Sequence, residues 1–93
     1  MLQRKIHDNM TTEAPEVGYL YSVIKPLVSF PDKVEILRMV DDKGTLLELS
    51  LHKEDMGKVI GKQGDTARAI RKIIRQFAAI NNRHIALKIN EPR

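Results

Sequence analysis

The sequence predicts a small α+β domain in which helices cover one face of a three-stranded sheet. Apolar residues alternate with polar ones in three short stretches, which is the period of half-buried strands. Other stretches carry apolar residues three or four positions apart, which is the period of a helix with one buried face. At 93 residues the chain allows one domain with a modest core. The predicted order is helix, strand, strand, helix, helix, strand.

The first stretch, residues 1–16, mixes polar and charged types without a period. We therefore expect a disordered leader there and a folded domain over 17–93. From Val17 the apolar residues follow helical spacing through Val28. Pro26 lies inside this helix and should kink it or change its direction, because proline lacks the amide that the helix would use.

Three strands are expected after this helix. Residues 34–40 alternate imperfectly, whereas 45–51 alternate cleanly and place three leucines on one face. Between them, the sequence Asp-Asp-Lys-Gly at 41–44 predicts a hairpin loop. The last strand is predicted at 85–89, where apolar residues again occupy every second position.

Two helices should separate the second and third strands. A short helix is expected over 53–59 with His52 near its N-cap, and a longer one over 66–79 with Asp65 as its N-cap. The pair at 81–82, Asn-Asn, should close the longer helix because asparagine tolerates the left-handed conformation.

The longer helix has an apolar face and a cationic face. The apolar face consists of Ala67, Ile70, Ile74 and Phe77. The cationic face consists of Arg68, Arg71, Lys72 and Arg75. Residues 53–93 hold ten Lys/Arg against four Asp/Glu, whereas 1–52 hold six against eight. Such a basic half is typical either of a solvated surface or of a field that attracts a polyanion.

The loop between the two helices reads Gly61-Lys62-Gln63-Gly64. Glycine has no Cβ, so a sugar-phosphate backbone can approach the main-chain N–H groups, and Lys62 adds a cation at the tip. The same glycines could simply allow a tight turn between helices. The basic helix after the loop and the pair Val59-Ile60 before it favour a phosphate-binding loop.

The block from Asp55 to Gly64, together with the element order and Ile24-Lys25-Pro26-Leu27-Val28, resembles type II KH domains. More narrowly, it is similar to the small stand-alone bacterial KH proteins of the KhpA family, over about residues 19–89. The resemblance implies a single type II KH domain with helices on one face of a three-stranded mixed sheet. It also implies a clamp for about four nucleotides of single-stranded RNA. The residues that it places at the RNA are Lys58, Val59, Ile60, Gly61, Lys62, Gln63, Gly64, Arg68 and Arg71.

The resemblance further implies a cytoplasmic RNA chaperone or post-transcriptional regulator that forms a homodimer or pairs with a larger Jag-like KH protein, KhpB. The chain departs from the family at Asp65, where a basic residue is common. An acid there would weaken phosphate binding unless it turns inward as the helix cap. No aromatic residue lies in the loop, so bases should be held by apolar contact and hydrogen bonds, with Ile60 serving the core, the cleft floor or both. A protein-association module with weak or partner-dependent RNA binding is the alternative.

Enzymatic, metal and membrane functions are not predicted. The chain has no Cys, and its three His lack metal-ligand spacing. The stretch from Gly57 to Gln63 is one residue short of a Walker loop and lacks the Ser or Thr that would bind Mg²⁺. The pair Asp41-Asp42 is typical of a turn. We therefore expect no cofactor and no metal site, and no apolar run approaches the roughly 20 residues of a membrane span.

Overall fold

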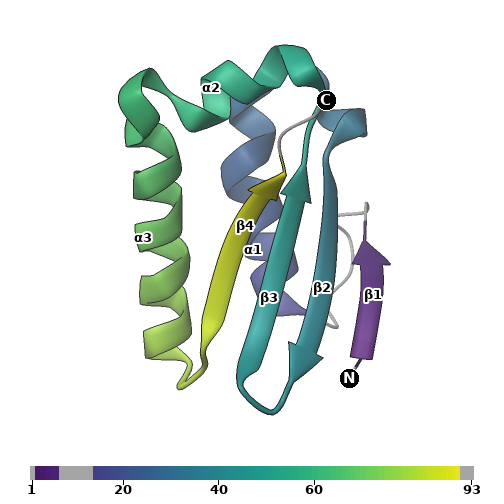
Figure 1. The fold of residues 1–93 in the computed structure, drawn as a ribbon, viewed down its shortest axis with the longest axis vertical. Coiled ribbons are helices and arrows are strands. Elements are labelled where there is room, and N and C mark those ends of the chain that lie inside the picture. The colour runs from purple at the N-terminus through teal and green to yellow at the C-terminus, as the bar shows by residue number, and fades with distance from the viewer. Residues whose placement is uncertain (1, 7–13, 91–93) are drawn as a thin grey trace.

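The structure is a computed structural model that describes residues 2–6 and 14–90 of the chain, with side chains over 14–90. Its strands and helices follow one another as β1 (Leu2–Ile6), α1 (Pro15–Ile24), β2 (Glu35–Asp41), β3 (Gly44–Ser50), α2 (Met56–Ile60), α3 (Asp65–Ile80) and β4 (Ile85–Asn90) (Figure 1). Short 3₁₀ turns connect them at Lys25–Leu27, Pro31–Lys33, Lys53–Asp55 and Lys62–Gly64. From α1 onward, this is the predicted order of elements.

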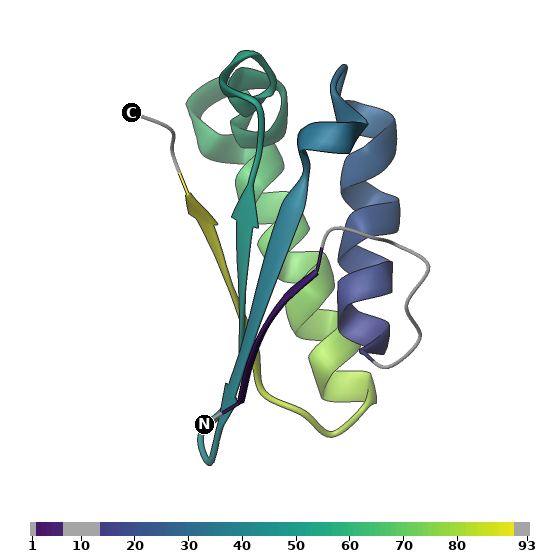
Figure 2. The ribbon, with the colours of Figure 1, turned by 90° about the vertical axis from the view of Figure 1, so that its right-hand side faces the viewer.

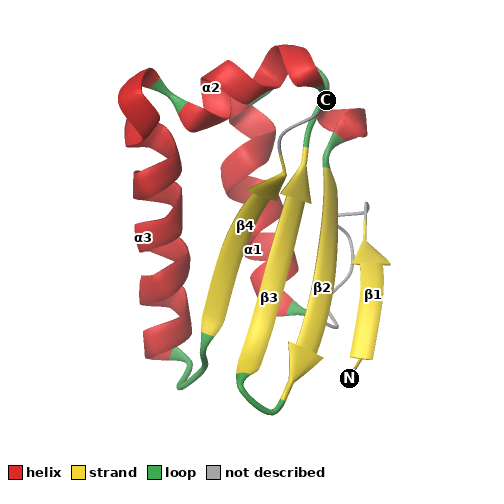
Figure 3. Cartoon of the chain, in the orientation of Figure 1, coloured by secondary structure: helices red, strands yellow, loops and turns green. Residues whose placement is uncertain are grey.

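The sheet has the strand order β1-β2-β3-β4 (Figure 3). β2 pairs with β3 antiparallel and β3 pairs with β4 parallel, which confirms the predicted mixed sheet of three strands. β1 adds a fourth strand, antiparallel to β2. The predicted disordered leader over 1–16 is therefore wrong at 2–6, where the backbone pairs along β2, and at Pro15 and Glu16, which begin α1. Ala14, which precedes α1, is buried, and the rest of that leader, 1 and 7–13, lies outside the described residues.

The helices cover one face of the sheet, as predicted, and the other face carries no helix (Figure 2). The core between the two layers combines the inward residues of β2 and β3 with the apolar stripes of α1 and α3. Its largest fully buried apolar side chains are Leu20, Ile24, Ile36, Leu47, Leu49 and Ile74. The alternation and the helical spacing in the sequence therefore select the residues that meet in the core.

Helices α1 and α3 end near the proline and the asparagine pair noted in the sequence. Pro26 lies in the 3₁₀ turn that terminates α1, so it ends the α-helix rather than kinking its interior. Asn82 takes a φ of 54° after α3. There the Asn82 amide donates to the Ala79 carbonyl at 3.2 Å and the Arg83 amide donates to the Ala78 carbonyl at 2.8 Å. These two bonds form the Schellman motif that satisfies the last carbonyls of a helix.

A buried carboxylate ties three elements together. Glu16 in α1 is fully buried and accepts a bond from Arg38 Nε of β2 at 2.7 Å, and it also pairs with Arg83 beyond α3. Burial raises the pKa of Glu16, but the bond to Arg38 and the two guanidinium charges outweigh it, so the pKa lies below its usual 4.5. The ion pairs hold the start of α1 against the turn that precedes β4.

None of the helices within residues 14–90 combines the length and the apolar character that crossing a membrane requires. Within the described ranges, no three His, Asp or Glu side chains gather closely enough to hold a metal ion.

Candidate nucleic-acid interface

The Gly61–Gly64 loop changes the chain direction between α2 and α3, and three of its four residues have positive φ. Gly61 takes φ 78° and ψ 177°, Gln63 takes φ 55° and Gly64 takes φ 79°. A Cβ at Gly61 would lie 2.2 Å from Thr66 Oγ1, so only glycine lets the loop pack against the start of α3. The geometry confirms the tight turn, and it is compatible with the predicted phosphate-binding loop, because the glycine that permits the turn also leaves the loop tip without bulk.

The tip of the loop is exposed and cationic. Lys62 and Gln63 are both exposed, and Lys62 begins the 3₁₀ turn that leads into α3. The first N–H groups of such a turn have no partner within it, so they are available to an outside acceptor. An exposed ammonium beside available amides is an arrangement that binds a phosphate.

The helix before the loop serves mainly the core. Val59 is fully buried, so its predicted contact with RNA could come only from its backbone. Ile60 is partly buried at the end of α2, which suits the double role expected for it. Lys58 is half-exposed, but its ammonium donates to Ser29 Oγ and lies 3.5 Å from Asp55 Oδ1. Lys58 is thus tethered away from the loop tip.

Asp65 is not the N-cap of α3, which corrects the sequence prediction. Gly64 occupies the cap position in the left-handed conformation, and no side chain caps the helix there. The reason is the loop itself: its left-handed residues bring Asp65 into helical geometry one position early. Asp65 is exposed and pairs with Arg68, itself exposed, three residues later. The acid therefore stays beside the loop and engages the cation that should meet a phosphate.

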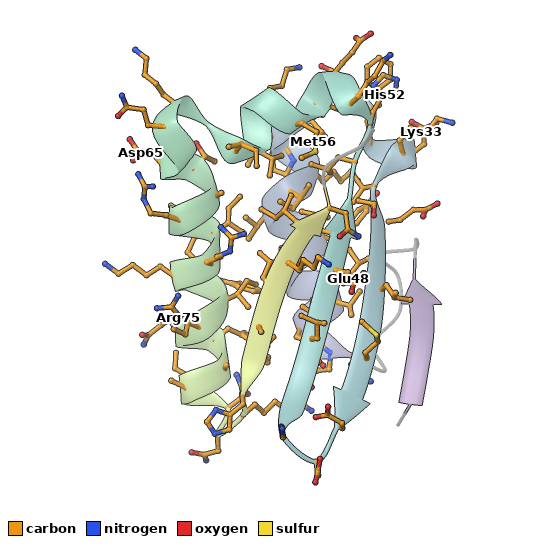
Figure 4. All side chains as sticks on the ribbon, viewed as in Figure 1. Lys33, Glu48, His52, Met56, Asp65 and Arg75 are labelled. Carbon is orange, nitrogen blue, oxygen red and sulfur yellow. The ribbon has the colours of Figure 1, made fainter. Side chains whose placement is uncertain are left out.

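Arg71 connects α3 to β4. Its Nε donates to the Leu87 carbonyl at 3.4 Å, and the side chain is partly buried. The predicted groove beside the loop would run along this junction, with Arg68 and Arg71 on its helical side. Figure 4 shows Asp65 near the loop end of α3 and Arg75 farther along the same helix.

The sequence prediction missed the role of Asp55. This side chain is 1% exposed, and its two oxygens accept bonds from the backbone amides of Ser29 at 2.9 Å and Phe30 at 3.0 Å. Burial raises the pKa of Asp55, but the bonds from these two amides and then the charge of Lys58 lower it by more. The pKa of Asp55 is therefore below its usual value. Asp55 lies four residues before the buried Val59 and so shares its helical face, which is the signal that could have revealed it.

His52 lies before the 3₁₀ turn that opens this region, as predicted. Its Nδ1 accepts a bond from the Glu54 amide at 3.1 Å, and its ring stacks on Phe30 with centroids 4.1 Å apart. Figure 4 places His52 and Lys33 together at one end of the molecule, near the short turns. Asp55 and His52 therefore hold the segment that precedes α2 and the loop against residues 29 and 30.

Comparison with known proteins points to one family. The model of the KH domain of KhpA/KhpB matches residues 18–89. The chain is 41% identical over 70 residues to the RNA-binding protein KhpA of Clostridium acetobutylicum, covering 75% of this chain and 93% of that protein. It is 43% identical over 72 residues to the KhpA of Listeria monocytogenes, covering 77% and 95%. With the KhpA of Bacillus subtilis it shares 51% identity over 57 residues, covering 61% and 68%.

Proposed function

The chain belongs to the KhpA/KhpB family of KH domains, and from that premise we propose that it binds single-stranded RNA through the Gly61–Gly64 loop and the adjoining side of α3. The observation that carries the proposal is the exposed Lys62–Gln63 tip, held by glycine-dependent geometry at the start of a cationic helix edge. Relatives that span most of the chain bear the name RNA-binding protein. We propose further that this chain acts in the cytoplasm as an RNA chaperone or post-transcriptional regulator.

In this proposal the loop grips the sugar-phosphate backbone and the junction of α3 with β4 receives the bases. Lys62 and the amides of the loop bind one phosphate. Arg68 leaves its ion pair with Asp65 and binds the next phosphate along the strand. The partly buried Ile60 offers apolar contact to a base. With so few cations in reach, affinity for a short strand is modest and falls with salt, at a slope of about −0.7 per phosphate.

The deciding experiment replaces Lys62 and Gln63 by Asp and measures binding to randomised single-stranded oligoribonucleotides by gel shift. Both side chains are exposed, so the fold should persist by circular dichroism while most RNA binding disappears. The matched control, Lys33→Asp with Ser22→Asp, lowers the net charge by the same three units at exposed positions outside the loop. A folded loop variant with unchanged affinity would overturn the proposal. Crosslinking in cells followed by sequencing would then identify the bound RNA.

We also propose that the chain forms a homodimer through an apolar face on α1 and α3. Three of the exposed large hydrophobic side chains among residues 14–90 gather there, namely Tyr19 at 36%, Ile73 at 38% and Ile80 at 70% exposure. They surround an open hollow of about 670 Å³, in which Tyr19 stacks on Phe77 with ring centroids 4.9 Å apart. Such clustering on a small domain marks an interaction site.

The spacing of this face favours a second helix as its partner. Ala69, Ile73, Gln76 and Ile80 follow one another at intervals of four, three and four residues, which is the repeat of a helix-pairing seam. A second copy of α3 supplies the same seam, so a two-fold pairing is self-complementary. KhpB is the other candidate partner, and a chain that remains monomeric alone would point to it. The alternative function is protein association with weak or partner-dependent RNA binding, for which this apolar face offers a surface in addition to the loop and groove.

A further inference from the structure

A second group of basic side chains lies at the end of α3 opposite to the loop. There the last turns of α3, the turn into β4 and the β2–β3 hairpin surround a hollow of about 490 Å³, which we call the distal hollow. Its polar lining includes Lys43, Arg75, Arg83 and His84. Among the described residues that line it, none is acidic. In Figure 3 the end of α3, the start of β4 and the hairpin converge at the same end of the molecule.

Backbone contacts fix these residues relative to one another. The Thr45 amide donates to the His84 carbonyl at 2.8 Å, and this joins the hairpin to the turn before β4. Gly44, at φ 139°, packs so closely that a Cβ there would lie 2.6 Å from the same carbonyl. Arg83 is held by the buried Glu16. The backbone segments that carry these residues, and the side chain of Arg83, are therefore positioned around the hollow before any ligand arrives.

The charges around the hollow are only partly compensated. Glu16 carries one negative charge between Arg38 and Arg83, so this buried group retains a net positive charge. Asp41 accepts a bond from the backbone amide of Lys43, not from its ammonium. Within residues 14–90, no acid pairs with the exposed side chain of Arg75. Asp42 also precedes Lys43 but does not line the hollow.

We propose that the distal hollow is a further nucleotide subsite, in which Lys43 and Arg75 bind a phosphate and the exposed ring of His84 stacks on a base. The inference rests on the proposed RNA binding. From Asp65 to Arg75, α3 advances about 15 Å. The loop clamp takes up about four nucleotides, so a longer single strand continues along α3 to the hollow. A base can stack on histidine, and the volume of the hollow is within the usual range of small-ligand sites.

The test compares fluorescein-labelled, sequence-randomised oligoribonucleotides of four and eight nucleotides by fluorescence polarisation. An eight-residue strand offers about five registers to a four-residue site, so register alone makes it about fivefold tighter. Stacking in the distal hollow should add at least another fivefold. We therefore expect a ratio of about 25 for the unmodified chain, and a ratio near five would overturn the subsite.

Substitutions in the distal hollow test whether the additional affinity for the longer strand arises there. Lys43→Gln with Arg75→Gln should return the ratio to about five and leave four-nucleotide binding unchanged. The control pair, Lys25→Gln with Lys33→Gln, removes two exposed charges elsewhere and should keep the ratio of the unmodified chain. Equal ratios in the two double variants would refute the assignment. His84→Ala should lose the stacking gain, whereas His84→Phe should keep it.

The loop variant separates this inference from the proposal on which it rests. Lys62→Asp with Gln63→Asp should abolish four-nucleotide binding, because that length reports only the loop. If it binds the four-nucleotide strand normally, the loop proposal fails whatever the length ratio is. In ¹⁵N spectra, the amides of 83–86 should shift with eight nucleotides and not with four. Shifts confined to the loop at both lengths would contradict the distal hollow alone.

Discussion

The two exposed edges of α3 differ in whether the chain satisfies them by itself. On the part of the cationic edge nearest the loop, Arg68 pairs with Asp65 and Arg71 bonds to the Leu87 carbonyl. On the apolar edge, Ile73 and Ile80 remain exposed. A ligand on the first edge must replace existing polar partners, so its net gain is small. A partner on the second edge removes apolar surface from water without breaking any such bond.

Because of this difference, self-association and RNA binding should respond to substitutions at different residues. In the proposed functions, the cationic edge would provide selectivity and salt dependence, because exposed charges exchange partners at little net gain. The apolar edge would provide the larger drive toward assembly. Since the edges lie on opposite sides of one helix, a copy bound at the apolar edge leaves the loop and the β4 side of α3 free.

The largest effect should come from the loop. Gly61→Ala forces a Cβ to within 2.2 Å of Thr66 Oγ1 at a backbone conformation of φ 78°. We expect the free energy of unfolding to fall by about 2–3 kcal/mol and RNA binding to be lost. Gly57→Ala is the matched control, because a Cβ there meets nothing within 4 Å and should stabilise the helix slightly. Urea unfolding that ranks the two variants the other way would contradict the loop geometry.

A charge at the centre of the apolar edge should weaken the proposed dimer. Ile73→Asp places a charge in the proposed dimer seam, and we expect the dimer to weaken by about 2 kcal/mol or more, roughly 30-fold. Binding of a four-nucleotide strand should not change. Light scattering across a wide concentration range measures the association. Leu27→Asp, at an apolar side chain of nearly equal exposure that does not line the hollow of the proposed dimer face, is the control. Equal masses for both variants at every concentration would remove the apolar edge from the assembly.

A third change should affect both edges equally, because it loosens the frame that carries them. Glu16→Gln leaves Arg38 and Arg83 without their buried partner. Since both arginines are partly solvated, we expect a loss of about 2 kcal/mol, less than for a fully enclosed pair. Glu54→Gln, at an exposed carboxylate, is the control. Thermal unfolding should separate them, and indistinguishable midpoints would show that the ion pairs add no stability.

The stabilising effect of Glu16 should also depend on pH. Its folded-state pKa lies below the usual 4.5, so the stabilisation is complete above that value and disappears as pH falls through the lower folded value. The difference in stability between the unmodified chain and Glu16→Gln should therefore shrink in acid. Denaturant titrations at pH 7 and near pH 3 give both differences. A constant difference would mean that the charge of Glu16 is not the cause.

The smallest expected effect is a gain in RNA affinity at the cationic edge. Asp65→Asn removes the partner of Arg68, so RNA should bind a few-fold more tightly, by less than about 1 kcal/mol. Stability should change little, because Asp65 makes no capping bond. Asp32→Asn, at an exposed turn, controls for net charge. Filter binding at low salt should resolve the pair, and an equal gain in both variants would assign the effect to net charge alone.

Much of the fold could be predicted from the sequence because its signals are local. Period-two alternation at 45–51 and helical spacing at 66–79 select their own buried faces whatever packs against them. The pair Asn81-Asn82 closes α3 through its own backbone geometry. The loop at 61–64 was likewise found from its glycines, although their steric need, the contact with Thr66, appears only in three dimensions.

By itself, the sequence determined the element order, the core residues and the exposed loop tip, because each depends on neighbours within a few positions of the chain. Only the tertiary structure decided the rest. It paired 2–6 with β2, moved Asp65 from a cap to a partner of Arg68, and buried Asp55 against two amides 25 and 26 residues away. It also brought Lys43 beside Arg75 and His84. These outcomes join segments that are distant in sequence, and no local period or propensity encodes which distant segment will supply the partner.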